Sequence, residues 1–465
     1  MTAETRHTAG HLRVCNQGRF LRETDGSPFF WLADTAWELF HRLTEDEVRH
    51  YFTVRAGQGF NVVQAVILAE LDGLHAADAG GRLPLVDDDP MRPNDDYFRW
   101  VDRVVELARD AGLRLALLPT WGDKVHDGMW GVGPVVFNPT NAQAFGRYLG
   151  ERYRQASHIV WVLGGDRPAA PDAAVWDAMA AGLREGLQRE TLMTYHPNAP
   201  HSSSDALHGR AWLSINTMQS GHSFTDAPSW RQITRDLARR PAKPTLDAEP
   251  CYEHHPIDPF SRAWRPEHGR FTDHDVRKVA YRAVFAGACG HTYGSHSVWQ
   301  FWTPQREPVN HPAPDWRAAM HGPGAQQMVW LKRLMLSRPY FDRVPAPELL
   351  PDVRDDTRDP WPTPGDADPD RAHRPVATRD AQGRFAMVYV PTAGQELRVT
   401  VQTPCGEAIA RWFDPRNGTS HDAGRWGDGT HVFRSPRAGP DWVLVLDDAA
   451  AGFGPPATAD SATAG

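Results

Sequence analysis

Residues 158–166 read HIVWVLGGD, an apolar run that ends in two glycines and an aspartate. An apolar run without alternating polar residues is typical of a strand that is buried on both faces of a parallel sheet. A similar run, LRLALLPT, occupies residues 113–120, and an amphipathic stretch at 141–155 separates the two. This strand–helix–strand pattern predicts an α/β fold.

The same unit recurs along the first three quarters of the chain. The predicted strands are 29–34, 61–68, 113–120, 158–165, 191–196, 213–218, 243–249 and 291–296. The predicted helices are 44–57, 97–111, 141–155, 173–188, 228–239, 273–288 and 324–336. Eight units over about 300 residues fit a closed (β/α)8 TIM barrel better than an open doubly wound sheet. The first strand is not followed by GxGxxG, which weakens the dinucleotide-binding alternative.

Composition divides the chain into five segments. Residues 1–28 are predicted to form an N-terminal β-hairpin entry, 29–340 the barrel, and 341–375 a linker rich in proline and aspartate. A small C-terminal antiparallel β-sandwich is predicted over 376–449, and residues 450–465 are expected to be a disordered tail. The strands predicted for the sandwich are 384–391, 396–403, 408–415, 431–435 and 441–448.

Charge and hydropathy exclude several functional classes. The 465-residue chain has a formal net charge of −8, with charged residues spread along it, which argues against nucleic acid and anionic membranes as partners. No run reaches the roughly 18 apolar residues of a membrane span. Residues 1–12 contain no apolar signal-peptide core, so a cytoplasmic location is expected. The four cysteines are far apart, so neither a disulfide scaffold nor a structural zinc site is expected.

Polar and aromatic residues gather where the predicted strands end, which is where the active site of such a barrel lies. These residues are Asp34, Glu70, Trp121, Asp166, Tyr195, His196, Gln219, His222, Glu249 and Trp299. Several carboxylates among aromatic and amide side chains suit glycoside hydrolysis, which needs one carboxyl group as an acid and a second as a nucleophile or base. Asp166 and Glu249 follow the fourth and seventh strands, on opposite sides of the barrel, where they could flank a sugar.

Several of these residues also have a purely structural interpretation. Asp166 could cap the next helix or pair with Arg167, and Asp34 could open the first helix. His196 and His222 are expected to be hydrogen-bonding neighbours of the carboxylates rather than acid–base catalysts. Glu70 could form a salt bridge at the barrel rim instead of binding substrate. Trp121 and Trp299 could fill the barrel mouth as core residues instead of stacking on a sugar.

Metal catalysis is the main chemical alternative, because the chain contains 22 histidines. Metallohydrolase barrels usually carry His-x-His near the end of the first strand, and here that strand ends in ADTA at residues 33–36. The chain also contains no HExxH and no GxSxG. We therefore expect no metal and no cofactor. His254 and His255, in a proline-rich loop, are expected to lie at the surface.

Taken together and in order, the strand-end strings resemble the apiosidase-like glycoside hydrolases. Among these strings are PFFWLADTAWELFHRLT, IVWVLGGDRP, MQSGH, KPTLDAEPCYE and GHTYGSHSVWQFW, and the resemblance covers about residues 12–345. The β domain resembles the C-terminal module of that family, which carries a collagen-binding label. No motif of the family is broken.

The resemblance implies a retaining (β/α)8 glycosidase that removes β-linked apiose, a branched furanose. By their positions in the family motifs, Asp166 is the implied general acid/base and Glu249 the implied nucleophile. The implied substrate-binding residues are Asp34, Trp37, Trp121, Gln219, His222 and Tyr252, to which the strand-end pattern adds Glu70, Tyr195, His196 and Trp299.

The predicted function is thus that of an exo-acting furanosidase with a carbohydrate substrate, and neither nucleic acid nor a membrane is expected as a partner. The lack of a recognisable export signal favours a small plant oligosaccharide or glycoside over polymeric pectin as that substrate. A glycosidase for another sugar, such as an arabinofuranoside or galactofuranoside, is the first alternative, and a non-catalytic carbohydrate-binding protein is the second. The oligomeric state stays open.

Overall fold

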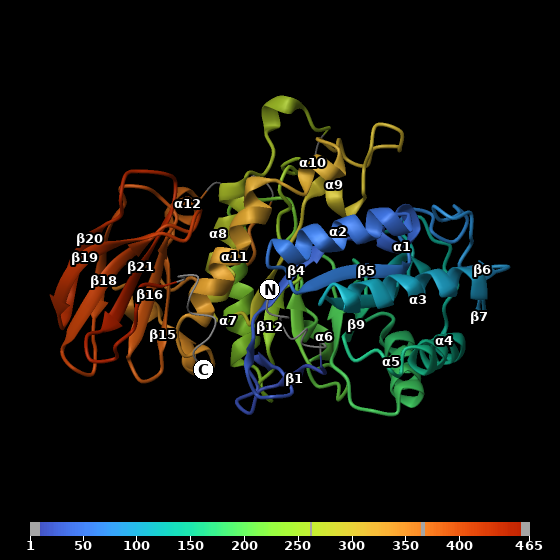
Figure 1. Ribbon diagram of the computed structural model, residues 1–465, viewed down its shortest axis with the longest axis horizontal. Coiled ribbons are helices and arrows are strands. Elements are labelled where there is room, and N and C mark those ends of the chain that lie inside the picture. The colour runs from blue at the N-terminus through green and yellow to red at the C-terminus, as the bar shows by residue number, and fades with distance from the viewer. Residues whose placement is uncertain (1–9, 261–262, 364–367, 457–465) are drawn as a thin grey trace, which may run out of the picture.

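A barrel of eight parallel strands forms the larger part of the molecule, and the (β/α)8 prediction is confirmed (Figure 1). The computed structural model describes residues 10–260, 263–363 and 368–456. The barrel strands are β4 (Trp31–Thr35), β5 (Val62–Leu68), β8 (Arg114–Thr120), β9 (Ile159–Gly164), β10 (Met193–His196), β11 (Asn216–Met218), β12 (Thr245–Asp247) and β13 (Gly290–Tyr293).

Hydrogen bonds close these strands into a ring. Six strands form one sheet in the order β10-β9-β8-β5-β4-β13, and β11 pairs with β12. The backbone N–H of Ser214 donates to Met193 O at 2.8 Å, which joins β11 to β10. On the other side, the N–H of Cys289 donates to Thr245 O at 2.9 Å, which joins β13 to β12. All eight carboxyl ends therefore meet at one rim.

All seven predicted helices are present around the strands. They are α2 (Glu45–Gly57), α3 (Asp95–Asp110), α4 (Pro139–Arg152), α5 (Ala173–Leu187), α7 (Ser229–Ala238), α8 (Asp273–Phe285) and α11 (Pro323–Leu336). Thr44 and Glu47 form a capping box at the start of α2. Five short helices were not predicted, namely α1 (Leu39–Arg42), α6 (Ser204–Leu207), α9 (His296–Trp299), α10 (Trp316–Ala319) and α12 (Pro369–His373).

The barrel strands are apolar along their whole length because both of their faces are covered. On β8, Leu115 and Leu117 pack with the outer helices, whereas Ala116 and Leu118 belong to the core inside the barrel. Successive side chains of a strand point to opposite faces. A strand buried on both faces therefore reads as a continuous apolar run, which is the pattern that made these strands predictable.

The C-terminal domain consists of two antiparallel sheets. The larger has the order β14-β15-β16-β21-β18-β19 and the smaller is β17-β20. The strands are β14 (Arg343–Pro345), β15 (Val376–Asp380), β16 (Phe385–Val390), β17 (Glu396–Val401), β18 (Glu407–Phe413), β19 (Ser420–Gly427), β20 (Gly429–Arg434) and β21 (Trp442–Asp448). Three of these were not predicted: β14, β15 and β19. The last of them reads SHDAGRWG and is largely exposed, so it has no apolar pattern.

The sandwich and the barrel share one hydrophobic core. Figure 1 shows the sandwich beside α8 and α11, and its apolar residues Phe385 and Val445 belong to the same cluster as the barrel interior. The rings of Tyr389 and Tyr281 stack with centroids 5.0 Å apart. Next to them, the buried guanidinium of Arg277 donates to Asp441 at 2.8 and 3.0 Å. The domain boundary is therefore a packed interior rather than a flexible joint.

The described part of the segment predicted as a linker, residues 341–363 and 368–375, packs against the barrel. The buried carboxylate of Asp356 accepts hydrogen bonds from Trp230 Nε1 at 3.0 Å and from Arg231 Nε at 2.9 Å. At the C-terminus, Phe453 packs against Phe385, and Arg338 donates to Gly454 O at 2.9 Å. The prediction of disorder is thus wrong for residues 450–456, because they seal the shared core, while residues 457–465 lie outside the described part.

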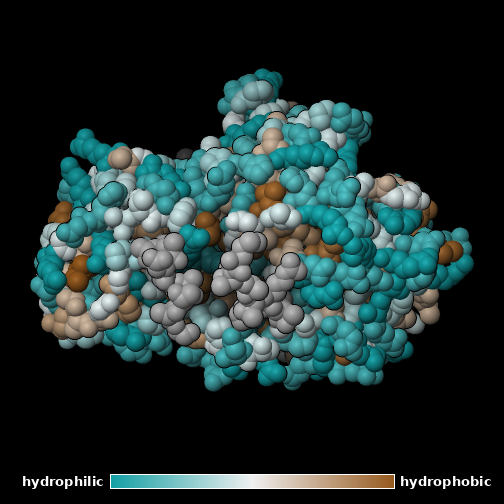
Figure 2. Space-filling view, viewed as in Figure 1, coloured by the Kyte–Doolittle hydropathy of each residue, from teal (hydrophilic) through white to brown (hydrophobic). Residues whose placement is uncertain are grey.

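The N-terminal segment is a small antiparallel sheet of three strands rather than a single hairpin. These strands are β1 (Arg13–Val14), β2 (Leu21–Arg22) and β3 (Pro28–Phe29), and residues 1–9 lie outside the described part. A further hairpin, β6 (Leu85–Val86) and β7 (Asp89–Pro93), projects from the barrel. The face shown in Figure 2 is mainly hydrophilic. Within the described residues, no helix is long and apolar enough to cross a membrane.

Candidate active site

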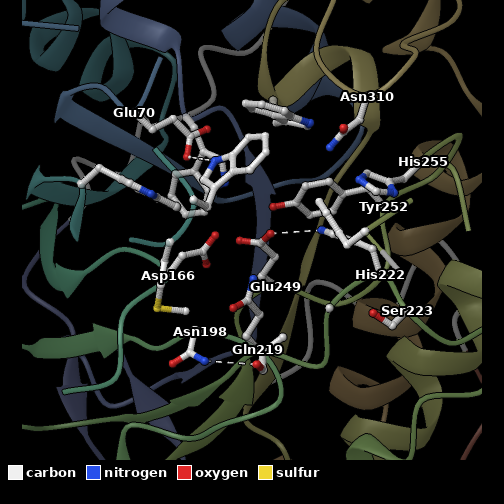
Figure 3. Close-up of a pocket in the computed structure, with 18 residues that line it drawn as sticks. Glu70, Asp166, Asn198, Gln219, His222, Ser223, Glu249, Tyr252, His255 and Asn310 are labelled. Atoms are coloured by element: carbon white, nitrogen blue, oxygen red, sulfur yellow. Dashed lines mark hydrogen bonds and ion pairs between the residues drawn. The ribbon is translucent and has the colours of Figure 1, made fainter. Parts of the chain in front are cut away.

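A cavity of about 460 Å³ lies at the carboxyl ends of the barrel strands, a size that suits a small-molecule ligand (Figure 3). Nine residues singled out from the sequence line it: Trp37, Glu70, Trp121, Asp166, Gln219, His222, Glu249, Tyr252 and Trp299. The other lining residues are Met129, Trp130, Asn198, Ala199, Gly221, Ser223, His255, Phe260 and Asn310. The structure thus brings residues from all parts of the barrel rim around one space.

Two carboxyl groups face each other in this cavity. Asp166 follows β9 and Glu249 follows β12, and Figure 3 shows their carboxyl groups side by side. The Nε2 atom of His196, at the end of β10, lies 3.4 Å from Asp166 Oδ1 and 3.0 Å from Glu249 Oε2. One oxygen of each carboxyl group and one nitrogen of His196 all lie within 4.8 Å of one another. The two acids are therefore close enough to act on one bond.

The turn that precedes Asp166 explains the two glycines in the sequence. Gly164, Gly165 and Asp166 all have positive φ angles, of 92°, 115° and 52°. A Cβ atom on Gly165 would lie 2.6 Å from Gly122 N and 2.8 Å from the Trp121 ring. Only glycine fits such a position without strain. Asp166 does not cap α5, whose N-cap residue is Asp172, so the helix-cap interpretation is wrong.

Glu249 is held as an anion. Burial alone would raise the pKa of its carboxyl group, but hydrogen bonds from His196 and His222 outweigh burial and lower that pKa to about 2. His222 Nε2 lies 3.1 Å from Glu249 Oε1, and His196 faces the other oxygen. His222 therefore hydrogen-bonds to one carboxylate oxygen, and the imidazole of His196, 3.0 Å from the other oxygen, favours the negatively charged form.

The pKa of the Asp166 carboxyl group is shifted in the opposite direction, upward. Burial raises the pKa of its carboxyl group, and the negative charge of Glu249 raises it further. Burial also disfavours the charged form of His196, yet its two carboxylate neighbours raise the pKa of the imidazole to about 9. At neutral pH the group thus combines an anionic Glu249 with a cationic His196, and the pKa of Asp166 is shifted upward, in the direction that a general acid needs. Two carboxyl groups with pKa values pushed apart are the arrangement expected for an acid and a nucleophile.

Comparison with known proteins places this site in a family. The model described as "Apiosidase-like, catalytic domain" matches residues 15–342. This chain belongs to the apiosidase-like family. A second model, described as "Putative collagen-binding domain of a collagenase", is similar to residues 365–447. The predicted resemblance is confirmed for both parts of the chain.

Two solved structures are similar to almost the whole apiosidase-like chain. One, described as a glycoside hydrolase, is 28% identical with a TM-score of 0.83 and covers 97% of this chain and 99% of its own. The other, a glycoside hydrolase family 5 protein from Bacteroides vulgatus, is also 28% identical, with a TM-score of 0.85 and 97% coverage of both chains. No curated protein matches the sequence. The protein is a glycoside hydrolase, as its family and these structures show.

Three of the residues predicted to bind substrate do not line the cavity of this apiosidase-like barrel. The buried Asp34 Oδ2 accepts from Arg55 Nε and from Tyr51 OH, both at 2.6 Å, so Asp34 anchors α2 to the barrel. Tyr195 points outward, and its hydroxyl donates to Arg167 O at 3.0 Å. The next residue, His196, points inward because side chains alternate along a strand, and it lies beneath both carboxyl groups rather than on the cavity wall.

The buried pair of Asp34 and Arg55 yields a stability prediction. We expect Asp34→Ala to lower the free energy of unfolding by about 3–5 kcal/mol, because the Arg55 guanidinium stays buried without its counter-charge. Urea denaturation measures this loss. The double variant Asp34→Leu/Arg55→Met should be far more stable than the single one. If Asp34→Ala instead had normal stability and a raised KM, Asp34 would be a substrate-binding residue, as predicted from the sequence.

Several functional residues were missed by sequence reasoning. His255 was expected at the surface, but its ring stacks on His222 with centroids 4.1 Å apart and lies 4.3 Å from the His296 ring. Contacts with residues far away in the sequence bury it, and the proline-rich loop gives no sign of them. Trp130 comes from an irregular glycine-rich loop. Of these residues, Asn198 could have been predicted, because it lies two residues after His196 at the end of a predicted strand.

The three residues Asp166, His196 and Glu249 are also of the types that hold metal ions. Only Nε2 of His196 faces both carboxyl groups, at 3.4 and 3.0 Å. As a cation this imidazole donates from Nε2 and cannot coordinate a metal through the same atom. The raised pKa of His196, which its two carboxylate neighbours cause, therefore favours proton chemistry at this point.

Proposed function

We propose that this glycoside hydrolase is an exo-acting furanosidase, most simply a β-apiosidase, that works with retention of configuration. One observation carries the proposal: Asp166 and Glu249 converge on the same nitrogen of His196. Carboxyl groups about 5–5.5 Å apart are typical of retaining enzymes, whereas inverting enzymes leave about 6.5–9.5 Å for a water. Oxygens within 4.8 Å of each other fit the first class.

In the first step, the protonated carboxyl group of Asp166 gives its proton to the glycosidic oxygen while the Glu249 carboxylate attacks the anomeric carbon. The bond between the anomeric carbon and the leaving oxygen breaks, and that oxygen departs as an alcohol. The sugar is then linked to Glu249 as an ester. The hydrogen bond from His222 and the ion pair with His196 hold the carboxylate before the attack and so fix its direction.

In the second step, the Asp166 carboxylate takes a proton from a water molecule, whose oxygen attacks the anomeric carbon. The ester bond to Glu249 breaks, and the carboxylate and the protonated Asp166 are regenerated. Loss of the ester returns the negative charge to Glu249, where His196 and His222 stabilise it. The free sugar leaves with the configuration it had in the substrate.

Unsatisfied polar atoms around the carboxyl groups suit the hydroxyl groups of a sugar. Trp121 Nε1, Gln219 Oε1, Asn198 Oδ1, His222 Nδ1 and Tyr252 OH are buried and have no hydrogen-bond partner in the described part of the protein. All five residues line the cavity. Buried polar groups normally have partners, so donors and acceptors of this kind mark where a polar ligand belongs.

The proposal is tested by sugar release from a panel of β-apiosides, α-arabinofuranosides and β-galactofuranosides. Apiose release, with transfer to methanol that gives only the β-glycoside, is expected for a retaining apiosidase. Release of another sugar would keep the mechanism and replace the substrate. Binding of the panel without turnover would mean a carbohydrate-binding protein, and loss of activity to a chelator would mean a metal enzyme.

The pH dependence of kcat/KM provides a second test. Activity requires an ionised Glu249 and a protonated Asp166, so it should fall at strongly acidic pH, where Glu249 gains a proton, and again as the pH rises through the raised pKa of Asp166. The His196→Asn variant should move both limbs to higher pH, because loss of the cation raises the pKa of each carboxyl group. If neither limb of the pH profile moved in this variant, His196 would not set the pKa of either carboxyl group.

A further inference from the structure

A row of apolar side chains lies at the mouth of the cavity. The Trp130 ring centroid lies 6.3 Å from that of Trp299 and 6.4 Å from that of Phe260. Phe260 is 59% exposed and the neighbouring lining residue Met129 is 41% exposed, whereas the side chains of Asp166 and Glu249 are 18% and 7% exposed. The row therefore lies further out than the catalytic carboxyl groups.

The row crosses the cavity mouth from Phe260, whose ring centroid lies 6.2 Å from that of His255, to Met129 and Trp130, and this second end lies on the side of the acid. Arg167 directly follows Asp166, and its Nε donates to His126 O at 2.7 Å, which fastens the loop that carries Met129 and Trp130. Trp130 Nε1 donates to Glu70 Oε2 at 2.9 Å. Because Asp166 delivers its proton to the leaving oxygen, the leaving group must lie beside that loop.

The charge of the lining residues restricts what the leaving group can be. Among the described residues that line the cavity, none is lysine or arginine, and three are carboxylic acids. A uronate next to the cleaved bond would thus face the Glu249 carboxylate without a guanidinium or ammonium partner, at a large electrostatic cost. Aromatic rings and a thioether, by contrast, attract an uncharged aromatic ring.

We propose that Met129, Trp130 and Phe260 form a leaving-group subsite for an uncharged aromatic aglycone. The assignment rests on the proposed function, since it takes Asp166 as the acid. An isolated exposed apolar residue needs no explanation, but the exposed Met129 and Phe260 beside the half-buried Trp130, at the mouth of one cavity, mark a binding surface. The substrate class is therefore an aromatic glycoside rather than a polymer of uronic acids.

The test compares two glycosides of the sugar that the panel identifies, one of 2-phenylethanol and one of ethanol. Both are primary alcohols of similar acidity, so the proton transfer is matched and only the aromatic ring differs. The wild-type ratio of kcat/KM is expected to be about tenfold in favour of the aromatic glycoside, and to fall to about one in Met129→Ala/Phe260→Ala. Met91→Ala is the matched control, because Met91 is 59% exposed and outside the cavity.

A wild-type ratio near one, or an unchanged ratio in the double variant, would overturn the assignment and leave the proposed function intact. Saturation-transfer NMR of 2-phenylethanol tests the subsite even if no glycoside of the panel is cleaved. Signal in the wild type and in Met91→Ala, but not in the double variant, supports the subsite. Equal signals in all three proteins, or stronger signals from methyl galacturonate, contradict it.

Discussion

Glu249→Gln should release sugar at least about 10⁴-fold more slowly than the wild type, because an amide cannot attack the anomeric carbon. The change keeps the size of the side chain, so the neighbouring His196 and His222 should stay in place. Initial rates on the best substrate of the panel measure the loss. Calorimetric titration of the same variant should show that the substrate still binds.

The matched control for this variant is Glu70→Gln. Burial and the neighbouring carboxyl groups of Glu38, Asp166 and Glu249 raise the pKa of Glu70 well above its usual range, so the uncharged amide changes this side chain less than it changes Glu249. We therefore expect a far smaller loss in Glu70→Gln than in Glu249→Gln. In Glu249→Ala, azide should restore turnover and form a glycosyl azide of inverted configuration. Equal losses at the two glutamates, or an azide of retained configuration, would contradict the role of Glu249.

Asp166→Ala should lose about 10²–10⁴-fold in kcat/KM on an alkyl glycoside, whose leaving oxygen needs a proton. The same variant should lose much less on a 4-nitrophenyl glycoside, since the phenolate leaves without one. The ratio of the two losses is the quantity to measure. The high-pH limb of the rate profile should also disappear, because no acid remains to be deprotonated.

The outcome for Asp166 separates its role from that of a residue that only shapes the site. A damaged site would lose activity equally on both substrates and keep its high-pH limb. Asp166→Asn serves as the conservative comparison, because it keeps the shape of the side chain beside His196 but has no acidic proton. It should show the same dependence on the leaving group as Asp166→Ala.

The barrel was predictable because its signals are local. Strands buried on both faces read as apolar runs, and each run is followed by a helix or a long loop. Counting eight such strand–helix units was therefore enough to predict a (β/α)8 barrel. β19 escaped because its exposed residues carry no apolar pattern. β14 was missed because it lies in a segment whose prolines and aspartates suggest a loop, and its partner β15 follows directly after that segment.

The site was predictable only to the level of strand ends. Asp34 and Asp166 both follow an apolar strand, and nothing nearby in the sequence tells them apart. A contact with Arg55, on the following helix, removes Asp34 from the cavity, whereas three positive φ angles turn Asp166 into it. His255 and Trp130 lie in loops without periodicity, so their positions depend on packing partners that the local sequence does not name.

The shared core also bears on how this architecture can be inherited. The two family models divide the chain between residues 342 and 365, but the apolar packing does not divide there. A gene fragment that encoded only the barrel would expose the apolar faces of α8 and α11 to solvent, together with Arg277, which is buried in the full chain. Recombination could exchange this module only for one with a matching apolar face and a carboxylate in the place of Asp441. The two parts thus match separate family models but share one packed interior, and each constrains the substitutions that the other can accept.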